Sequence, residues 1–382
     1  MPREANTSVL VQKHLFHTAK LELDTAESIP ATIGYETYGQ LNARRDNAVL
    51  ICHDFAGSSH AAGRYSIEEL SSGWWDALIG PGKAFDTDRY YVIAVDSLCN
   101  LHPRDPRVVT TGPASIDPAT GRPYGAKFPQ ISIRDNVRLQ RQLLDSLGVE
   151  RLTCVAGPGM GGFTALEWAV TYPHAADRII AAAATPQAGP VYALSACQAG
   201  IDAIQADPAY ADGSYVTAGE PLSGLRRALY LRNVLTRSDA WISGMWERKT
   251  AAASTHPRME MKGRFAFQAE MAEMALLDAY TCDADHFIYT ARACLLHDIG
   301  YGNRGLEVAA QLIRADLLLL PVTSDLICPT EAARSLVELV NVHGGRAELA
   351  AVESLNGHQA AVDECSRLAE PITRWMRRHE LH

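Results

Sequence analysis

A glycine-rich turn at residues 157–162 is the most specific chemical feature of this 382-residue sequence. The segment reads Gly-Pro-Gly-Met-Gly-Gly and runs from an apolar stretch directly into a helix-length stretch. In a nucleophile elbow, a sharp turn of this kind lifts a serine hydroxyl above the end of a sheet, and flanking glycines allow the strand and the helix to pack closely. Gly157 and Gly161 keep that frame, but Gly159 stands at the nucleophile position. We therefore expect the turn to lack an attacking side chain.

Two residues that could complete a catalytic triad follow in the expected order. Asp325 lies shortly after an apolar run that ends at Pro321, and His358 follows another apolar run that ends near Val352. An aspartate that holds one imidazole nitrogen orients the ring and leaves the other nitrogen as a general base. Asp325 could instead be a turn residue or a cap of the helix that begins near Thr330. The order of the two residues, and their places after strands, favour a catalytic pair.

The segment 53–60, His-Asp-Phe-Ala-Gly-Ser-Ser-His, follows the first predicted core strand. This position supplies backbone N–H groups for an oxyanion in nucleophile-elbow enzymes. We therefore assign Asp54, Phe55 and Met160 to a predicted oxyanion loop. The Asp54 carboxylate could also serve as a second base, whereas the two histidines of the segment are expected to be hydrogen-bonded loop residues.

The elements that must position these residues alternate along the chain. Short apolar runs rich in β-branched residues are separated by helix-length segments, which predicts an α/β fold with a mostly parallel sheet covered by helices. The glycine-rich turn, the segment 53–60 and the loops that contain Asp325 and His358 then lie at the carboxyl ends of strands, where open α/β sheets place their active sites. The predicted strands are Val49–Cys52, Tyr91–Val95, Leu152–Ala156, Ile179–Ala183, Leu317–Pro321 and Glu348–Val352. The predicted helices are Ile133–Leu147, Gly162–Tyr172, Thr330–Val342 and Gln359–Arg378.

This alternation stops between residues 187 and 305, where the sequence is helix-rich and contains no convincing strand. Strands resume at Leu317, so we interpret the segment as a helical lid inserted into the sheet domain. The predicted organisation is a core in two parts, residues 1–186 and 306–382, with the lid at 187–305.

Composition excludes several classes of protein. Lys and Arg number 35 against 44 Asp and Glu, a net charge of −9, which argues against nucleic-acid binding. No apolar run has the roughly 18–20 residues that a membrane span needs, and the first sixteen residues lack the apolar core of a secretion signal. The eight cysteines form no C-x-x-C pair, as is typical of reduced thiols in a cytoplasmic protein. No metal-ligand spacing and no nucleotide-binding motif is present, so we expect no metal and no cofactor.

Motifs along nearly the whole chain resemble those of the homoserine O-acetyltransferase family, which has the α/β-hydrolase fold. The resemblance implies an α/β-hydrolase sheet, a lid that builds a homodimer and narrows the active-site tunnel, and transfer of an acyl group from acyl-CoA through an acyl-serine. The matching stretches are residues 33–39 (Ile-Gly-Tyr-Glu-Thr-Tyr-Gly), 50–60, 73–83, 112–121, 128–135 and 165–168.

Three positions depart from that family. The nucleophilic serine falls on Gly159, the lid arginine that grips the substrate carboxylate falls on Leu229, and the aspartate after the catalytic histidine is Gln359. Arg232 follows Leu229 by about one helical turn and could replace the missing arginine. Leu229, Arg232 and Gln359 are therefore the residues that we predict to line the substrate pocket.

Three functions remain open on these departures. The first is an enzyme that uses Asp325 and His358 as a general acid–base pair, without a covalent intermediate, on a small molecule other than homoserine. The second is a non-catalytic binding or partner protein. The third is an acyltransferase or hydrolase whose serine was deliberately replaced.

Overall fold

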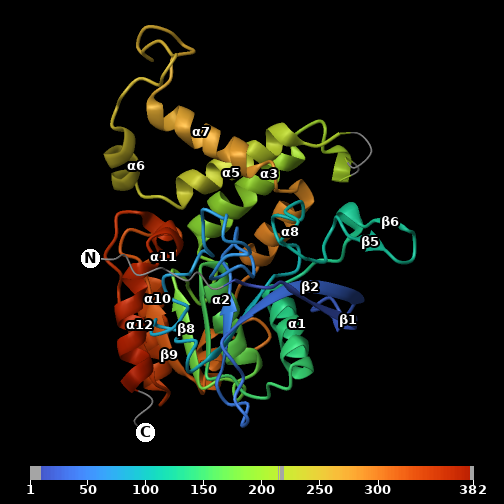
Figure 1. The fold of residues 1–382 in the computed structure, drawn as a ribbon. Helices are drawn as coiled ribbons and strands as arrows, with labels where there is room; N and C mark the ends of the chain where they lie inside the picture. Colours follow the sequence, from blue (N-terminus) through green and yellow to red (C-terminus); the bar gives the residue numbers. More distant parts are fainter. Residues whose placement is uncertain (1–9, 214, 216–218, 379–382) are drawn as a thin grey trace.

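A mostly parallel sheet forms the centre of the protein (Figure 1). The computed structural model describes residues 10–213, 215 and 219–378, and within these residues the sheet has eight strands in the order β1-β2-β4-β3-β7-β8-β9-β10. Strands β3, β4 and β7–β10 are parallel, whereas β1 and β2 form an antiparallel hairpin that joins the sheet through β4. Their bounds are β1 His14–Glu22, β2 Ser28–Tyr38, β3 Ala48–Cys52, β4 Tyr91–Val95, β7 Cys154–Pro158, β8 Arg178–Ala182, β9 Asp316–Leu320 and β10 Ala347–Leu349. A separate pair, β5 (Ile116–Asp117) and β6 (Arg122–Pro123), forms a short hairpin.

All six predicted strands are present, with small shifts at their ends. The last one is shorter than predicted and ends at Leu349. The hairpin of β1 and β2 was not predicted, because β1 alternates between partly buried and exposed residues and therefore contains no apolar run.

Both faces of the sheet are covered. Alternate residues of each central strand contribute to two different apolar clusters, since successive side chains of a strand point to opposite faces. Leu50 of β3 packs in the cluster that contains Leu166 of helix α2, whereas Val49 and Ile51 pack in the cluster that contains Trp375 of helix α12. The site is therefore held by a core of three layers, which are the sheet and the helices on each of its two faces. The bounds of the helices outside the lid are α1 Ile133–Ser146, α2 Met160–Thr171, α9 Leu306–Leu312, α10 Thr330–Val342, α11 Ala360–Asp363 and α12 Ser366–Arg378, with short 3-10 turns at Gly125–Lys127 and Gly357–Gln359.

The prediction of one continuous helix over Gln359–Arg378 was wrong. The structure has a 3-10 turn, the short helix α11 and then α12, with the break at Glu364, whose backbone leaves the helical region (φ −115°, ψ 31°). The apolar spacing alone does not reveal this break, because both helices bury residues against the same cluster.

The segment 187–305 is helical, and it contains no strand among the residues described there. It lies between β8 and β9 in sequence, and Figure 1 shows α5, α6 and α7 together at one end of the sheet, far from the carboxyl terminus. The bounds are η2 Tyr192–Gln198 (a π-helix), α3 Ala199–Gln205, η3 Ala211–Gly213, α5 Leu222–Leu235, α6 Asp239–Trp246, α7 Ala266–Asp278 and α8 Ala284–Leu295. Across the described chain, every helix is too short or too polar to span a membrane.

Two carboxyl groups at the start of α8 hold the preceding part of this segment. The Tyr215 hydroxyl donates to Asp283 at 2.9 Å, and the Tyr210 hydroxyl donates to Asp285 at 3.1 Å. The second oxygen of Asp285 is buried and has no hydrogen-bond partner among the described residues. Burial, together with the charge of Asp283, raises the pKa of Asp285 to about 7.

Asp285→Asn should stabilise the protein, and the gain should increase from pH 5 to pH 8. The ordinary pKa of 3.8 lies below the folded-state value of about 7, so the folded protein binds a proton that the unfolded chain has lost, and the parent loses stability as the pH rises between these values. The gain should approach about 4 kcal/mol at most at pH 8. Urea unfolding at several pH values measures it, with Asp88→Asn in an exposed loop as the control. A gain that is the same at every pH would contradict this explanation.

Candidate active site

The turn between β7 and α2 has the backbone of a nucleophile elbow. Gly159 has φ +53° and ψ −120°, a conformation that side chains disfavour. A Cβ on Gly161 would lie 2.1 Å from the carbonyl oxygen of Cys52, and one on Gly157 would lie 2.5 Å from the same oxygen. The glycines therefore let the turn approach the end of β3 more closely than any side chain would allow.

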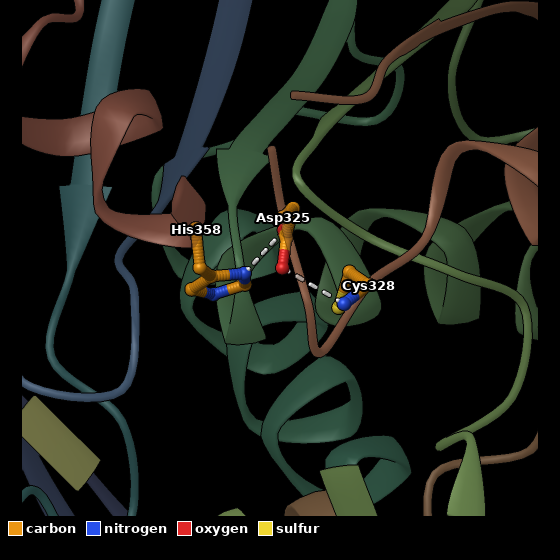
Figure 2. Close-up of side chains that lie close together, drawn as sticks. All are labelled: Asp325, Cys328 and His358. Carbon is orange, nitrogen blue, oxygen red and sulfur yellow. Dashed lines mark hydrogen bonds and ion pairs between the residues drawn. The ribbon is translucent and has the colours of Figure 1, made fainter. Parts of the chain in front are cut away.

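Asp325 and His358 meet in the structure, as their order in the sequence predicts (Figure 2). The Nδ1–H of His358 donates to Oδ2 of Asp325 at 2.7 Å. The other carboxylate oxygen accepts from the backbone N–H groups of Ile327 and Cys328, both at 2.9 Å. The Asp325 side chain is fully buried, whereas that of His358 is 13% exposed. The aspartate is thus fixed on both sides, and it leaves Nε2 of the imidazole free to exchange a proton. Asp325 does not cap the helix that begins at Thr330, because one of its oxygens accepts from its own loop and the other accepts from His358.

The free nitrogen of His358 lies directly beside residue 159. A Cβ built on Gly159 would lie 2.9 Å from Nε2, a distance that real Cβ atoms essentially never show. The same point is 3.7 Å from the Cβ of Asp54. This position of the ring is therefore compatible with a glycine at residue 159, and a side chain there would require the ring to shift.

Asp325, Cys328 and His358 also form a cluster of metal-ligand type, with their ligand atoms within 4.8 Å of one another. The carboxylate oxygens, however, already accept three hydrogen bonds. Burial raises the pKa of the Cys328 thiol well above its usual value, and the charge of Asp325 adds to this effect, so the thiolate that a metal requires is disfavoured. The geometry is that of a hydrogen-bonded acid–base pair, and the absence of a metal stays a prediction.

Two backbone N–H groups of the predicted oxyanion loop remain available. Those of Phe55 and Met160 donate to no acceptor in the part of the chain that the structure describes. Met160 begins α2, whose first-turn amides carry a partial positive charge. Both groups adjoin the elbow, so they could stabilise negative charge on a substrate oxygen.

A cavity of about 580 Å³ lies next to this centre, and its lining includes the neighbours Asp54 and Gln359 but not His358 or Gly159. It is lined by Asp54 and by α5 residues of the segment 187–305, which include Leu229 and Arg232. Gln359, next to His358, also lines it. The structure therefore brings the three predicted pocket residues to one cavity beside the acid–base pair. Leu229 is only 1% exposed and gives its part of the wall an apolar surface.

Arg232 carries a positive charge to the cavity floor. Its Nη2 lies 3.5 Å from Oδ2 of Asp54, and its guanidinium lies 5.3 Å from the centre of the Phe55 ring. The side chains of Arg232 and Asp54 are 11% and 10% exposed. This ion pair between the core and α5 was not predicted, because nothing in the sequence links two positions so far apart.

Two further histidines of the cavity wall have fixed partners. His102, which sequence reasoning missed, donates from Nε2 to the carbonyl of Ala56 at 3.1 Å, so its Nδ1 can accept from Thr281 at 2.9 Å. No pattern in the loop around residue 102 would have revealed it. His60 bonds through Nδ1 to the buried Glu36 at 3.1 Å, as expected of a loop histidine.

Comparison with known proteins gives consistent similarities. The chain is 39% identical over 331 residues to a homoserine O-acetyltransferase of Deferribacter desulfuricans, covering 87% of this chain and 85% of that protein. It is 38% identical over 355 residues to the same enzyme of Symbiobacterium thermophilum, covering 91% and 89%. Among solved structures, homoserine O-acetyltransferase from Bacillus anthracis matches with a TM-score of 0.93, 36% identity and coverage of 96% and 98%. Esterase E22 matches with a TM-score of 0.91, 34% identity and coverage of 96% and 100%. No protein-family model matches the chain.

Gly159→Ala should destabilise the protein for two separable reasons. The positive φ costs a side chain about 1–2 kcal/mol, and the new methyl group would also press on His358. Gly82→Ala is the matched control, since Gly82 has φ +70° and no atom within 4 Å of the added Cβ. Denaturant unfolding should show a larger loss for Gly159→Ala than for Gly82→Ala. Equal losses would mean that the methyl group does not press on the ring.

Proposed function

The chain belongs to the homoserine O-acetyltransferase family of proteins with the α/β-hydrolase fold, and we propose that it is a divergent enzyme of this family in which Gly159 replaces the nucleophilic serine. The proposed catalytic pair is Asp325 and His358, acting as general base and acid without a covalent intermediate or a cofactor. The chemistry open to such a pair includes elimination, cyclisation, and direct acyl transfer or hydrolysis.

One observation carries this proposal: the free Nε2 of His358 is held beside a residue that cannot attack. The 2.7 Å hydrogen bond to Asp325 fixes the ring, and the 2.9 Å separation from a Cβ at 159 leaves no room for a serine side chain without movement of that ring.

Direct attack by water or by an acceptor hydroxyl suits this geometry best. His358 Nε2 takes the proton of the attacking O–H group while its oxygen bonds to the acyl carbon. The N–H groups of Phe55 and Met160 would stabilise the oxyanion that forms. When the intermediate collapses, the bond to the departing oxygen or sulfur breaks, and the leaving group takes the proton back from His358. A similar protein, esterase E22, supports ester cleavage as a reaction of this fold.

The substrate pocket argues for a small molecule other than homoserine. Leu229 is apolar where the family resemblance places an arginine, and Gln359 stands where it places an aspartate. Arg232 supplies the positive charge from another place on α5, at the cavity floor. An anionic group bound there would be held differently from the carboxylate of homoserine.

Two further features of the family are proposed for this chain. The segment 187–305 would act as a lid and form a homodimer, and the side chains of Met245, Met259 and Met261, which are 56%, 76% and 101% exposed, offer apolar surface for this contact. Acyl-CoA is the proposed acyl donor. The close match of the fold to a homoserine O-acetyltransferase, with a TM-score of 0.93, supports acyl-CoA as the donor.

His358→Ala and Asp325→Asn should each lower ester hydrolysis by about 10²–10⁴-fold, since the general base or its orientation is lost. The assay is the kcat/KM for p-nitrophenyl acetate, with the exposed His174→Asn as the control. Gly159→Ser should not raise the rate, because the serine would displace the ring. A parent protein that is inactive, combined with a Gly159→Ser variant that transfers acyl groups from acyl-CoA, would refute the proposal and favour an inactivated enzyme.

The parent protein should form no O-acetylhomoserine from acetyl-CoA and homoserine at a rate above that of His358→Ala. The physical reason is the loss of both the serine and the charged groups that the resemblance associates with homoserine. Mass spectrometry of the reaction mixture measures the product. Formation of this product that depends on His358 would contradict the non-homoserine substrate while leaving the acid–base pair intact.

A further inference from the structure

The side chain of Asp54 lies near the reacting centre, on a different element from Asp325, and its Oδ2 accepts a long hydrogen bond from the backbone N–H of Ala56 at 3.4 Å. Asp54 follows β3, whereas Asp325 follows β9, and the two strands are separated by β7 and β8 in the sheet. The Cβ of Asp54 and Nε2 of His358 lie 3.7 Å and 2.9 Å from the same point, the place that a Cβ of residue 159 would take. Because residue 159 has no side chain, nothing from that residue separates the two groups.

Arg232 holds Asp54 in this place. The guanidinium lies 3.5 Å from Oδ2 and stacks near the ring of Phe55, the next residue of the same loop. Apart from Asp54, its polar contact within the described residues is a long hydrogen bond, 3.4 Å to Oδ1 of Asn233. A guanidinium has five N–H donors, so a nearly buried one with these few contacts is available both to Asp54 and to groups in the cavity. The pair holds the Asp54 side chain at the cavity, which both residues line.

We propose that Asp54 is a second catalytic residue, which accepts a hydrogen bond from the attacking water or hydroxyl and holds it for His358. The inference rests on the proposed function, since it needs His358 as the base. One hydrogen of the water, or the single hydrogen of a hydroxyl, passes to Nε2 as the oxygen–carbon bond forms. With water, the second hydrogen stays bonded to the oxygen and points to Asp54, which remains ionised throughout. The leaving group takes the proton from His358 as its bond to the acyl carbon breaks.

This role explains why a negative charge is tolerated next to the oxyanion loop. A lone carboxylate would oppose the oxyanion at Phe55 and Met160, but Arg232 offsets its charge. The negative charge of Asp54 would also offset the positive charge that His358 carries between the two proton transfers. Among the described residues, Asp325 is the hydrogen-bond partner of the imidazole, and the Cys328 thiol lies within 4.8 Å of this pair. Arg237, in the same region, is neutralised by Asp363 at 2.7 Å.

The inference is tested by removing the negative charge of Asp54 in one variant and the positive charge of Arg232 in another. Asp54→Asn should lower kcat for p-nitrophenyl acetate by about 10–100-fold with little change in KM, and it should move the midpoint of the pH–rate profile to lower pH. Arg232→Met should move that midpoint to higher pH, by about one unit. Arg232→Lys keeps the charge and should leave the midpoint near that of the parent. NMR titration of the His358 imidazole, assigned with His358→Asn, should show the same directions without any need for turnover.

The outcomes separate this inference from the function on which it rests. If His358→Asn abolishes hydrolysis while Asp54→Asn changes neither kcat nor the midpoint, Asp54 is not catalytic and the acid–base pair stands. If His358→Asn retains full activity, the pair and the role of Asp54 both fail. If Asp54→Asn unfolds, identical midpoints for Arg232→Met and Arg232→Lys would overturn the inference.

Discussion

The missing Cβ at residue 159 is the constraint on which the rest of the candidate site depends. The His358 ring is fixed on one side by a 2.7 Å hydrogen bond to the buried Asp325. On its other side, Nε2 lies where it would be 2.9 Å from a Cβ of residue 159. A Cβ at residue 159 would require the end of the ring to shift, so the place of the base and the identity of residue 159 are coupled. A side chain at 159 and this position of the imidazole exclude each other.

Charge at the site is arranged in two pairs that reach it from different directions. Asp325 and His358 both come from loops that follow strands of the sheet, whereas Asp54 comes from the loop after β3 and Arg232 from α5. The second pair therefore depends on how the helical segment packs on the core. A shift of α5 would change the separation of Arg232 and Asp54, and the energy of this ion pair depends on that distance. This dependence links the position of the helical segment to the electrostatics of the reaction.

The sequence patterns predicted the central strands of the sheet. They missed the β1–β2 hairpin at one edge of the sheet and the contact between Asp54 and Arg232. Strands β3, β7 and β9 are buried along their whole length, so they read as continuous apolar runs. The half-exposed strand β1 has no such run, and the break at Glu364 leaves the apolar spacing of the flanking helices undisturbed. The order of Asp325 and His358 after two strands predicted that they would meet. The pairing of Asp54 with Arg232 could not be predicted, because it depends on where an inserted helical segment comes to rest.

By itself, the sequence determined the chemistry that is available: a glycine frame without a nucleophile, one histidine and one aspartate after strands, and an arginine in a helical insertion. Only the tertiary structure decided which of these groups meet and how closely. Parallel strands place their carboxyl ends at one edge, so loops remote in sequence converge there. The distance between His358 and residue 159 is set by the packing of whole layers, which no local pattern of residues records.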